Sequence, residues 1–143
     1  MMNTIDAQKI KRVLLIDDDI DVLSTYEDIL EENGLDCVSC SDGISGIERL
    51  KKEAFDLVIV DSDMPDLDGS TVSRIVRFGL GKRYIPIVLI SGLSIEFDEL
   101  ECLKFGFNGF LRKPVTNESL MSLINNSIAN FKVDGISSWT GSL

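Results

Sequence analysis

The chain has 143 residues, of which 44% are hydrophobic and 27% charged, as expected for one ordinary globular domain. Its formal net charge of −10 argues against direct nucleic-acid binding, because contacts to phosphate groups need clustered Lys and Arg. The absence of His excludes every mechanism that needs an imidazole base, ligand or phosphocarrier.

The predicted elements of the first half are short strands that alternate with helices. Gly34 follows the first helical stripe as a suitable C-cap, and Ser41 or Asp42 can cap the start of the second. In chain order we expect a strand at 13–16, a helix at 22–30, a weaker strand at 35–40, a helix at 44–50 and a strand at 57–60.

The second half continues the alternation. We expect a helix at 72–76, a strand at 87–90, a helix at 97–104, a strand at 110–111 and a helix at 120–128. Short runs rich in β-branched residues are typical of parallel strands covered on both faces. A strand–helix unit that occurs five times therefore predicts an α/β fold with a doubly wound parallel sheet.

The pattern also predicts the limits of the domain. We place the domain over residues 11–131, an N-terminal tail over 1–10, and a C-terminal tail or the start of a linker over 132–143. Within that last segment we interpret Trp139 as a partly exposed tail residue, and the alternative is an anchor on the domain or on a partner.

The sequence favours neither a membrane segment nor a disulfide framework. No apolar run approaches transmembrane length or resembles a signal peptide, so we expect a cytoplasmic protein without a membrane partner. The three cysteines are an odd number, which argues against a disulfide framework. Cys37 and Cys40 lie in a predicted strand, where residues three apart face opposite sides, so we do not interpret them as a zinc or redox pair.

Polar residues follow four of the strands, at the edge where an open parallel sheet binds ligands. They are Asp17, Asp18 and Asp19 after the first strand, Asp61 to Pro65 after the third, Ser91 and Gly92 after the fourth, and Lys113 and Pro114 after the fifth. Each alone is ordinary, because a carboxylate after a strand is often a helix cap or turn residue. We interpret Asp19, Asp66 and Asp68 in that way.

Together these residues predict a cation and phosphoryl site. Clustered carboxylates repel one another unless a cation neutralises them, and oxygen ligands without His or Cys suit Mg²⁺. A phosphoryl group fits between Mg²⁺ and Lys113, which supplies a second positive charge. A carboxylate can itself be the nucleophile, and Asp61 ends the central strand between the acids and Ser91.

Four segments resemble the receiver domains of response regulators in two-component signalling. They are Leu14 to Asp19, Asp56 to Gly69, Ile85 to Gly92 and Gly109 to Pro114. The resemblance implies a flavodoxin-like (βα)5 domain with strand order 2-1-3-4-5 that signals and is not an enzyme. Its partners would be a histidine kinase or His-containing phosphotransfer protein, and a downstream protein or fused output domain.

The resemblance also implies the roles of the acidic residues. Asp61 would accept the phosphoryl group. Asp18 and Asp61 would bind Mg²⁺ directly, Asp17 would act mostly through water, and Asp63 would offer its backbone carbonyl.

The remaining roles concern the phosphoryl group and the switch. Ser91 and Gly92 would bind the phosphoryl oxygens, and Lys113 would pair with them. Phe110 would be the aromatic switch residue, because movement of Ser91 toward the phosphoryl group opens space for the ring.

Two features depart from the family pattern. The carboxylate of Asp63 lies beside the expected path of the attacking water, so we expect slow hydrolysis of the phosphorylated state. The last helix, residues 117–131, has almost no charge beyond Glu118. Family members that dimerise on DNA usually carry paired charges there, so we expect an apolar or polar partner surface instead.

Two other functions are compatible with parts of the sequence. Asp61-Ser62-Asp63 matches the opening motif of haloacid-dehalogenase-type phosphatases, but Pro65 occupies a position where that family needs Thr or Val. A pseudo-receiver would keep the fold and lose phosphotransfer. The presence of all five key residues argues against it: Asp17, Asp18, Asp61, Ser91 and Lys113.

Overall fold

A computed structural model of the chain describes residues 10–62, 64–92 and 104–130. Five parallel strands form one sheet in the order β2-β1-β3-β4-β5, as predicted. The strands are β1 (Arg12–Ile16), β2 (Asp36–Cys40), β3 (Leu57–Asp61), β4 (Ile87–Ser91) and β5 (Gly109–Arg112). Because all five are parallel, their carboxyl ends meet at one edge of the sheet.

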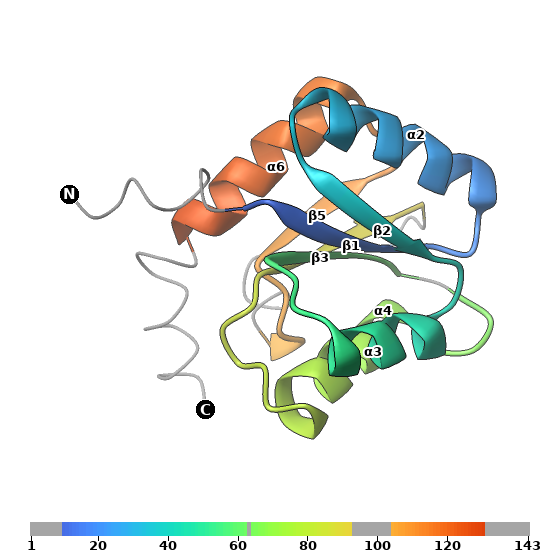
Figure 1. The fold of residues 1–143 in the computed structure, drawn as a ribbon, viewed down its shortest axis with the longest axis vertical. Coiled ribbons are helices and arrows are strands. Elements are labelled where there is room, and N and C mark those ends of the chain that lie inside the picture. The colour runs from blue at the N-terminus through green and yellow to red at the C-terminus, as the bar shows by residue number, and fades with distance from the viewer. Residues whose placement is uncertain (1–9, 63, 93–103, 131–143) are drawn as a thin grey trace.

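Helices cover both faces of the sheet (Figure 1). They are α2 (Ile20–Glu32), α3 (Gly43–Lys52), α4 (Gly69–Arg74), its π-helical continuation η2 (Ile75–Gly79), and α6 (Asn117–Asn130). Helices α2 and α6 lie on one face, and α3 and α4 lie on the other. The helix predicted at 97–104 falls almost entirely outside the described residues.

The alternation of side chains along each strand produces two apolar layers. In β1, Leu14 and Ile16 pack toward α3 and α4, whereas Val13 and Leu15 pack toward α2 and α6. All four side chains are buried. The sheet therefore has no solvent-facing side at its centre, which is why its strands are continuous apolar runs.

Aspartates cap three of the helices that follow strands. Asp19 accepts hydrogen bonds from the backbone N–H groups of Asp21 and Val22 at the start of α2. Asp42 and Asp68 do the same for α3 and α4. A carboxylate at this position pairs an unbonded N–H with negative charge at the positive end of the helix dipole. The caps start three helices directly beside the carboxyl edge of the sheet.

Arg77 joins η2 to the segments that lead into β4 and β5. Its side chain is only 2% exposed, and its guanidinium donates to the carbonyl oxygens of Lys82, Ile85 and Gly106. It also donates to Asn108 Oδ1 at 2.9 Å. Burial lowers the pKa of Arg77 to about 9.

Three further sequence predictions concern Cys37 and Cys40, the start of the domain, and membrane spans. Cys37 packs on the α2 side and Cys40 on the α3 side, so the two side chains face opposite ways, as predicted. Ile10, the last residue of the predicted N-terminal tail, is 8% exposed and joins the core. Across the described ranges, every helix is too short or too polar to cross a membrane.

Candidate functional site

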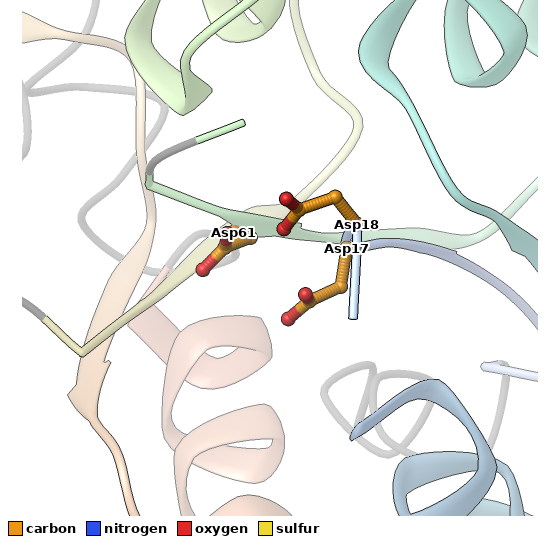
Figure 2. A group of neighbouring side chains, drawn as sticks. All are labelled: Asp17, Asp18 and Asp61. Carbon is orange, nitrogen blue, oxygen red and sulfur yellow. The ribbon is translucent and has the colours of Figure 1, made fainter. Parts of the chain in front are cut away.

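Three carboxylates meet where β1 and β3 end (Figure 2). Asp17 and Asp18 follow β1, and Asp61 is the last residue of the neighbouring strand β3. One oxygen from each carboxylate lies within 4.8 Å of the others. Asp17 and Asp61 are buried, whereas Asp18 is exposed. The structure thus brings together three of the four predicted metal ligands, and the fourth, Asp63, lies outside the described residues.

Lys113 reaches the same cluster from beyond β5. Its Nζ lies 3.1 Å from Asp17 Oδ2 and 3.1 Å from Asp61 Oδ1. The second oxygen of Asp17 accepts a hydrogen bond from the backbone N–H of Asp19 at 2.9 Å. Three carboxylates against one ammonium leave two negative charges uncompensated, which matches the charge of one divalent cation.

The pKa values of this cluster follow from the same charge balance. Burial, and after it the charge of Asp17, raises the pKa of Asp61, although Lys113 acts in the opposite direction. Burial opposes the charge of Lys113, but its hydrogen bonds to Asp17 and Asp61 raise its pKa above the ordinary value. The ammonium is therefore held charged, and it cannot fully offset two buried carboxylates.

The donor set fits Mg²⁺. All three candidate ligands offer carboxylate oxygens, and the exposed Asp18 leaves one side of the cluster open to water. Mg²⁺ keeps several waters and binds to proteins through a small number of carboxylates. Within the described ranges this is the one cluster of three or more such ligand side chains.

Ser91, at the end of β4, occupies the other side of the sheet edge. It is 1% exposed, and its hydroxyl accepts a hydrogen bond from Ser62 Oγ at 2.7 Å. The backbone N–H of Lys113 donates to the carbonyl of Ser91 at 2.8 Å. Gly92 is exposed beside Lys113, since a Cβ added there would lie 3.5 Å from Lys113 Cδ.

Strand register and side-chain alternation determine on which face of the sheet Asp61, Ser91 and Phe110 lie. Val60 and Leu89 pack toward α3 and α4, and Ile90 packs toward α2 and α6. Alternation then turns Asp61 to the α2 side and Ser91 back to the α3 side. Phe110 pairs with Leu89 and packs in the same layer as it, so Ser91 and Phe110 share a side.

The loop after Asp61 is fixed at both ends. The Asp66 carboxylate accepts from the backbone N–H groups of Gly43 and Ile44 at 3.1 and 2.9 Å. Gly69 donates to the carbonyl of Ser62 at 3.1 Å. A Cβ at Gly69 would lie 2.8 Å from the Asp61 carbonyl oxygen, so glycine is required there by space.

Sequence reasoning missed the roles of Ser62 and Asp66. Ser62 follows Asp61, which is in register with Ile90, so it lies opposite Ser91, and strand register alone would have revealed the pair. Asp66 contacts residues 22 and 23 positions away, and no local pattern indicates such a contact.

A family model described as the response regulator receiver domain matches residues 13–125. The chain belongs to this family. It is 35% identical over 122 residues to the transcription factor SKN7 of Saccharomyces cerevisiae, a match that covers 85% of this chain and 19% of that protein. It is 27% identical over 124 residues to the uncharacterized transcriptional regulatory protein YclJ of Bacillus subtilis, covering 87% of this chain and 53% of that protein. The chain thus spans about half or less of these relatives.

Solved receiver domains have the same fold. A response regulator receiver domain of Clostridium thermocellum superposes with a TM-score of 0.75 at 27% identity, covering 87% of this chain and 98% of that one. The receiver domain of a Pseudomonas aeruginosa PAO1 sensor histidine kinase gives a TM-score of 0.73 at 25% identity, covering 82% and 97%. That structure holds a magnesium ion in its active-site cleft. As a receiver domain of two-component signalling, the chain is a signalling domain.

Proposed function

We propose that this receiver domain accepts a phosphoryl group on Asp61, with Mg²⁺ bound beside it, and thereby switches a protein-interaction surface. The observation that carries the proposal is the buried Asp61 carboxylate, held 3.1 Å from Lys113 and within 4.8 Å of Asp17 and Asp18. The magnesium ion in the cleft of the Pseudomonas receiver supports the same assignment of the acids.

The phosphoryl donor would be a histidine kinase or a His-containing phosphotransfer protein. A carboxylate oxygen of Asp61 attacks phosphorus, and the bond from phosphorus to the donor imidazole nitrogen breaks, its electron pair returning to the ring. This chain contains no His, so the phosphohistidine must come from another domain or protein. Similarity to the hybrid signal transduction histidine kinase B of Dictyostelium discoideum supports a donor of this kind.

The metal site would be built from the acids. Asp18 and Asp61 would bind Mg²⁺ directly, Asp17 through water, and Asp63 through its backbone carbonyl. When bound, Mg²⁺ would neutralise negative charge on the phosphoryl oxygens during transfer. Lys113 supplies positive charge from the side of Asp17 and Asp61, and its two ion pairs fix the ammonium before the phosphoryl group arrives.

The output would pass through Ser91 and Phe110. Ser91 and Gly92 would bind a phosphoryl oxygen, together with Lys113. Ser91 would leave the side of the sheet that it shares with Phe110, and the ring would follow into the space released. The resulting surface would contact a downstream protein or a fused output domain.

The lifetime of the phosphorylated state is a further part of the proposal. We expect the Asp63 carboxylate to slow hydrolysis by disfavouring the approach of water. Replacing Asp63 with Asn should accelerate dephosphorylation, measured as loss of the phosphoryl group over time. An unchanged rate would remove Asp63 from this role.

Intact-mass spectrometry after incubation with Mg²⁺ and acetyl phosphate tests the central claim. We expect one base-labile phosphoryl group on the wild type and none on Asp61→Asn. Asp42→Asn is the matched control, because Asn caps a helix as well as Asp does and this variant should be phosphorylated normally. A wild type that gains no phosphoryl group would instead identify a pseudo-receiver.

A further inference from the structure

Ser62 forms a hydrogen bond that the proposed phosphotransfer does not use. Its hydroxyl donates to Ser91 Oγ across the strand pair at 2.7 Å, a normal length for such a bond. Ser62 is half-buried and directly follows the proposed acceptor Asp61. The acceptor of this bond, Ser91, is only 1% exposed.

The Ser62–Ser91 hydrogen bond lies on the opposite face of the sheet from the Asp61 side chain. The alternation along β3 places Asp61 on the α2 side, where Lys113 Nζ contacts its carboxylate. Ser62 and Ser91 face the α3 side, where Phe110 packs. A phosphoryl group on Asp61 would compete with Ser62 for the Ser91 hydroxyl. The bond between the two serines belongs to the resting arrangement, and the phosphoryl contact belongs to the switched one.

We infer that Ser62 is a positioning residue that holds Ser91 in its resting arrangement and so sets the equilibrium between the resting and switched states. This inference rests on the proposed function, because it needs a phosphoryl group that competes for Ser91. When Ser91 turns, the hydroxyl of the half-buried Ser62 can form a hydrogen bond with water in place of the bond to Ser91.

The size of the effect follows from the net worth of one hydrogen bond. Removing a bond made only in the resting state favours the switched state by about 2- to 10-fold. The Ser62→Ala variant should therefore bind a phosphoryl mimic more tightly than the wild type. A variant that merely disturbed the fold would bind it more weakly, so the direction of the change is diagnostic.

The experiment titrates beryllofluoride, in the presence of Mg²⁺, into the full chain and follows binding by NMR. We expect Ser62→Ala to bind about 2- to 10-fold more tightly, and Ser62→Thr, which keeps the hydroxyl, to return toward the wild type. Ser24→Ala, at an exposed position on α2, is the matched control and should leave binding unchanged. In a Ser91→Ala background, the effect of Ser62→Ala should disappear.

A second readout needs no ligand. In ligand-free Ser62→Ala, the ring resonances of Phe110 should move from their wild-type positions toward those of the beryllofluoride-bound protein. Thermal melts of each variant show that it is folded.

The outcomes separate this inference from the proposed function. If the wild type binds beryllofluoride and Ser62→Ala binds it equally or more weakly, the positioning role is wrong and phosphorylation of Asp61 stands. If the wild type neither binds beryllofluoride nor gains a phosphoryl group, the proposed function fails. The inference then fails with it, because nothing competes for Ser91.

Discussion

The backbone at Asp61 and Ser62 packs so closely against residue 69 that only glycine fits at that position. A Cβ at Gly69 would lie 2.8 Å from the Asp61 carbonyl oxygen and 3.2 Å from Ser62 Cα. Both of these are backbone atoms that cannot rotate away. The position of Asp61, the proposed acceptor, therefore depends on the absence of a methyl group eight residues further along the chain.

Gly69→Ala should accordingly destabilise the protein by about 1–3 kcal/mol, as expected for an overpacked site. It should also weaken Mg²⁺ binding, because the clash displaces the end of β3. Urea denaturation and a Mg²⁺ titration measure the two effects. Gly79→Ala is the control, since a Cβ there would meet only Ile75 Cγ2 at 3.4 Å. Equal stability of the two variants would contradict the packing argument.

At the scale of elements, Asp66 connects the loop after β3 to the start of α3. The loss of some hydration at this exposed carboxylate is outweighed by the hydrogen bonds from Ile44 and Gly43, so the pKa of Asp66 lies below its ordinary value. A carboxylate with a lowered pKa stabilises the fold above its unfolded pKa, and this contribution is lost as the pH falls through the folded pKa.

Asp66→Asn should therefore lower the free energy of unfolding at pH 7 by about 0.5–1 kcal/mol, a small effect because the group is exposed. The difference from the wild type should shrink as the pH falls below about 4. Urea denaturation at pH 7 and pH 3 measures it. Asp28→Asn, at an exposed position on α2, should show no such difference at either pH. A deficit for Asp66→Asn that is as large at pH 3 as at pH 7 would rule out the carboxylate as its cause.

Arg77 plays a comparable role for η2 and the starts of β4 and β5. Replacing it with Met removes the donors that serve the carbonyls of Ile85 and Gly106. We expect a loss of about 2–4 kcal/mol in the free energy of unfolding. Arg77→Lys should recover little of it, because an ammonium cannot reproduce the planar set of donors.

The control is Arg74→Met, which changes an exposed residue of the preceding helix α4 and should alter stability by less than about 0.5 kcal/mol. Chemical denaturation of the three variants compares them directly. If Arg77→Met were as stable as Arg74→Met, the buried guanidinium would have no structural role.

For the molecule as a whole, the charge balance at the sheet edge links metal binding to stability. Mg²⁺ at about 100 times its Kd should raise the melting temperature by about 5–10 °C, because it binds only the folded state. Asp18→Asn should reduce the rise, since it removes one of the proposed ligands. NaCl at matched ionic strength is the control, and a melting curve that Mg²⁺ does not move would remove the metal from the proposal.

The strands could be predicted from the sequence better than the local irregularities, such as the π-helical turn η2. Each predicted strand agrees with the structure within one residue at either end, because residues buried on both faces give continuous apolar runs. The signal was weakest for β2, an edge strand with only one buried residue. The π-helical turn η2 was not predicted, because an extra residue in the turn shifts a stripe of period 3.6.

At the candidate site too, the sequence predicted which residues come together but not all of their contacts. The sequence order of strand ends was enough to bring Asp17, Asp18, Asp61 and Lys113 together. It did not indicate the Ser62–Ser91 bond or the contact of Asp66 with α3, which depend on register and on packing between loops. Long-range contacts of this kind leave no periodic trace in the sequence.

The start of β1 and the end of α6 both lie at the edge of the sheet opposite the acidic cluster (Figure 1). A tether or fluorophore attached at the start of β1 or at the end of α6 would therefore sit at the edge of the sheet away from Asp17, Asp18 and Asp61. In the two relatives the matched part makes up 19% and 53% of the protein, so both carry further sequence outside it.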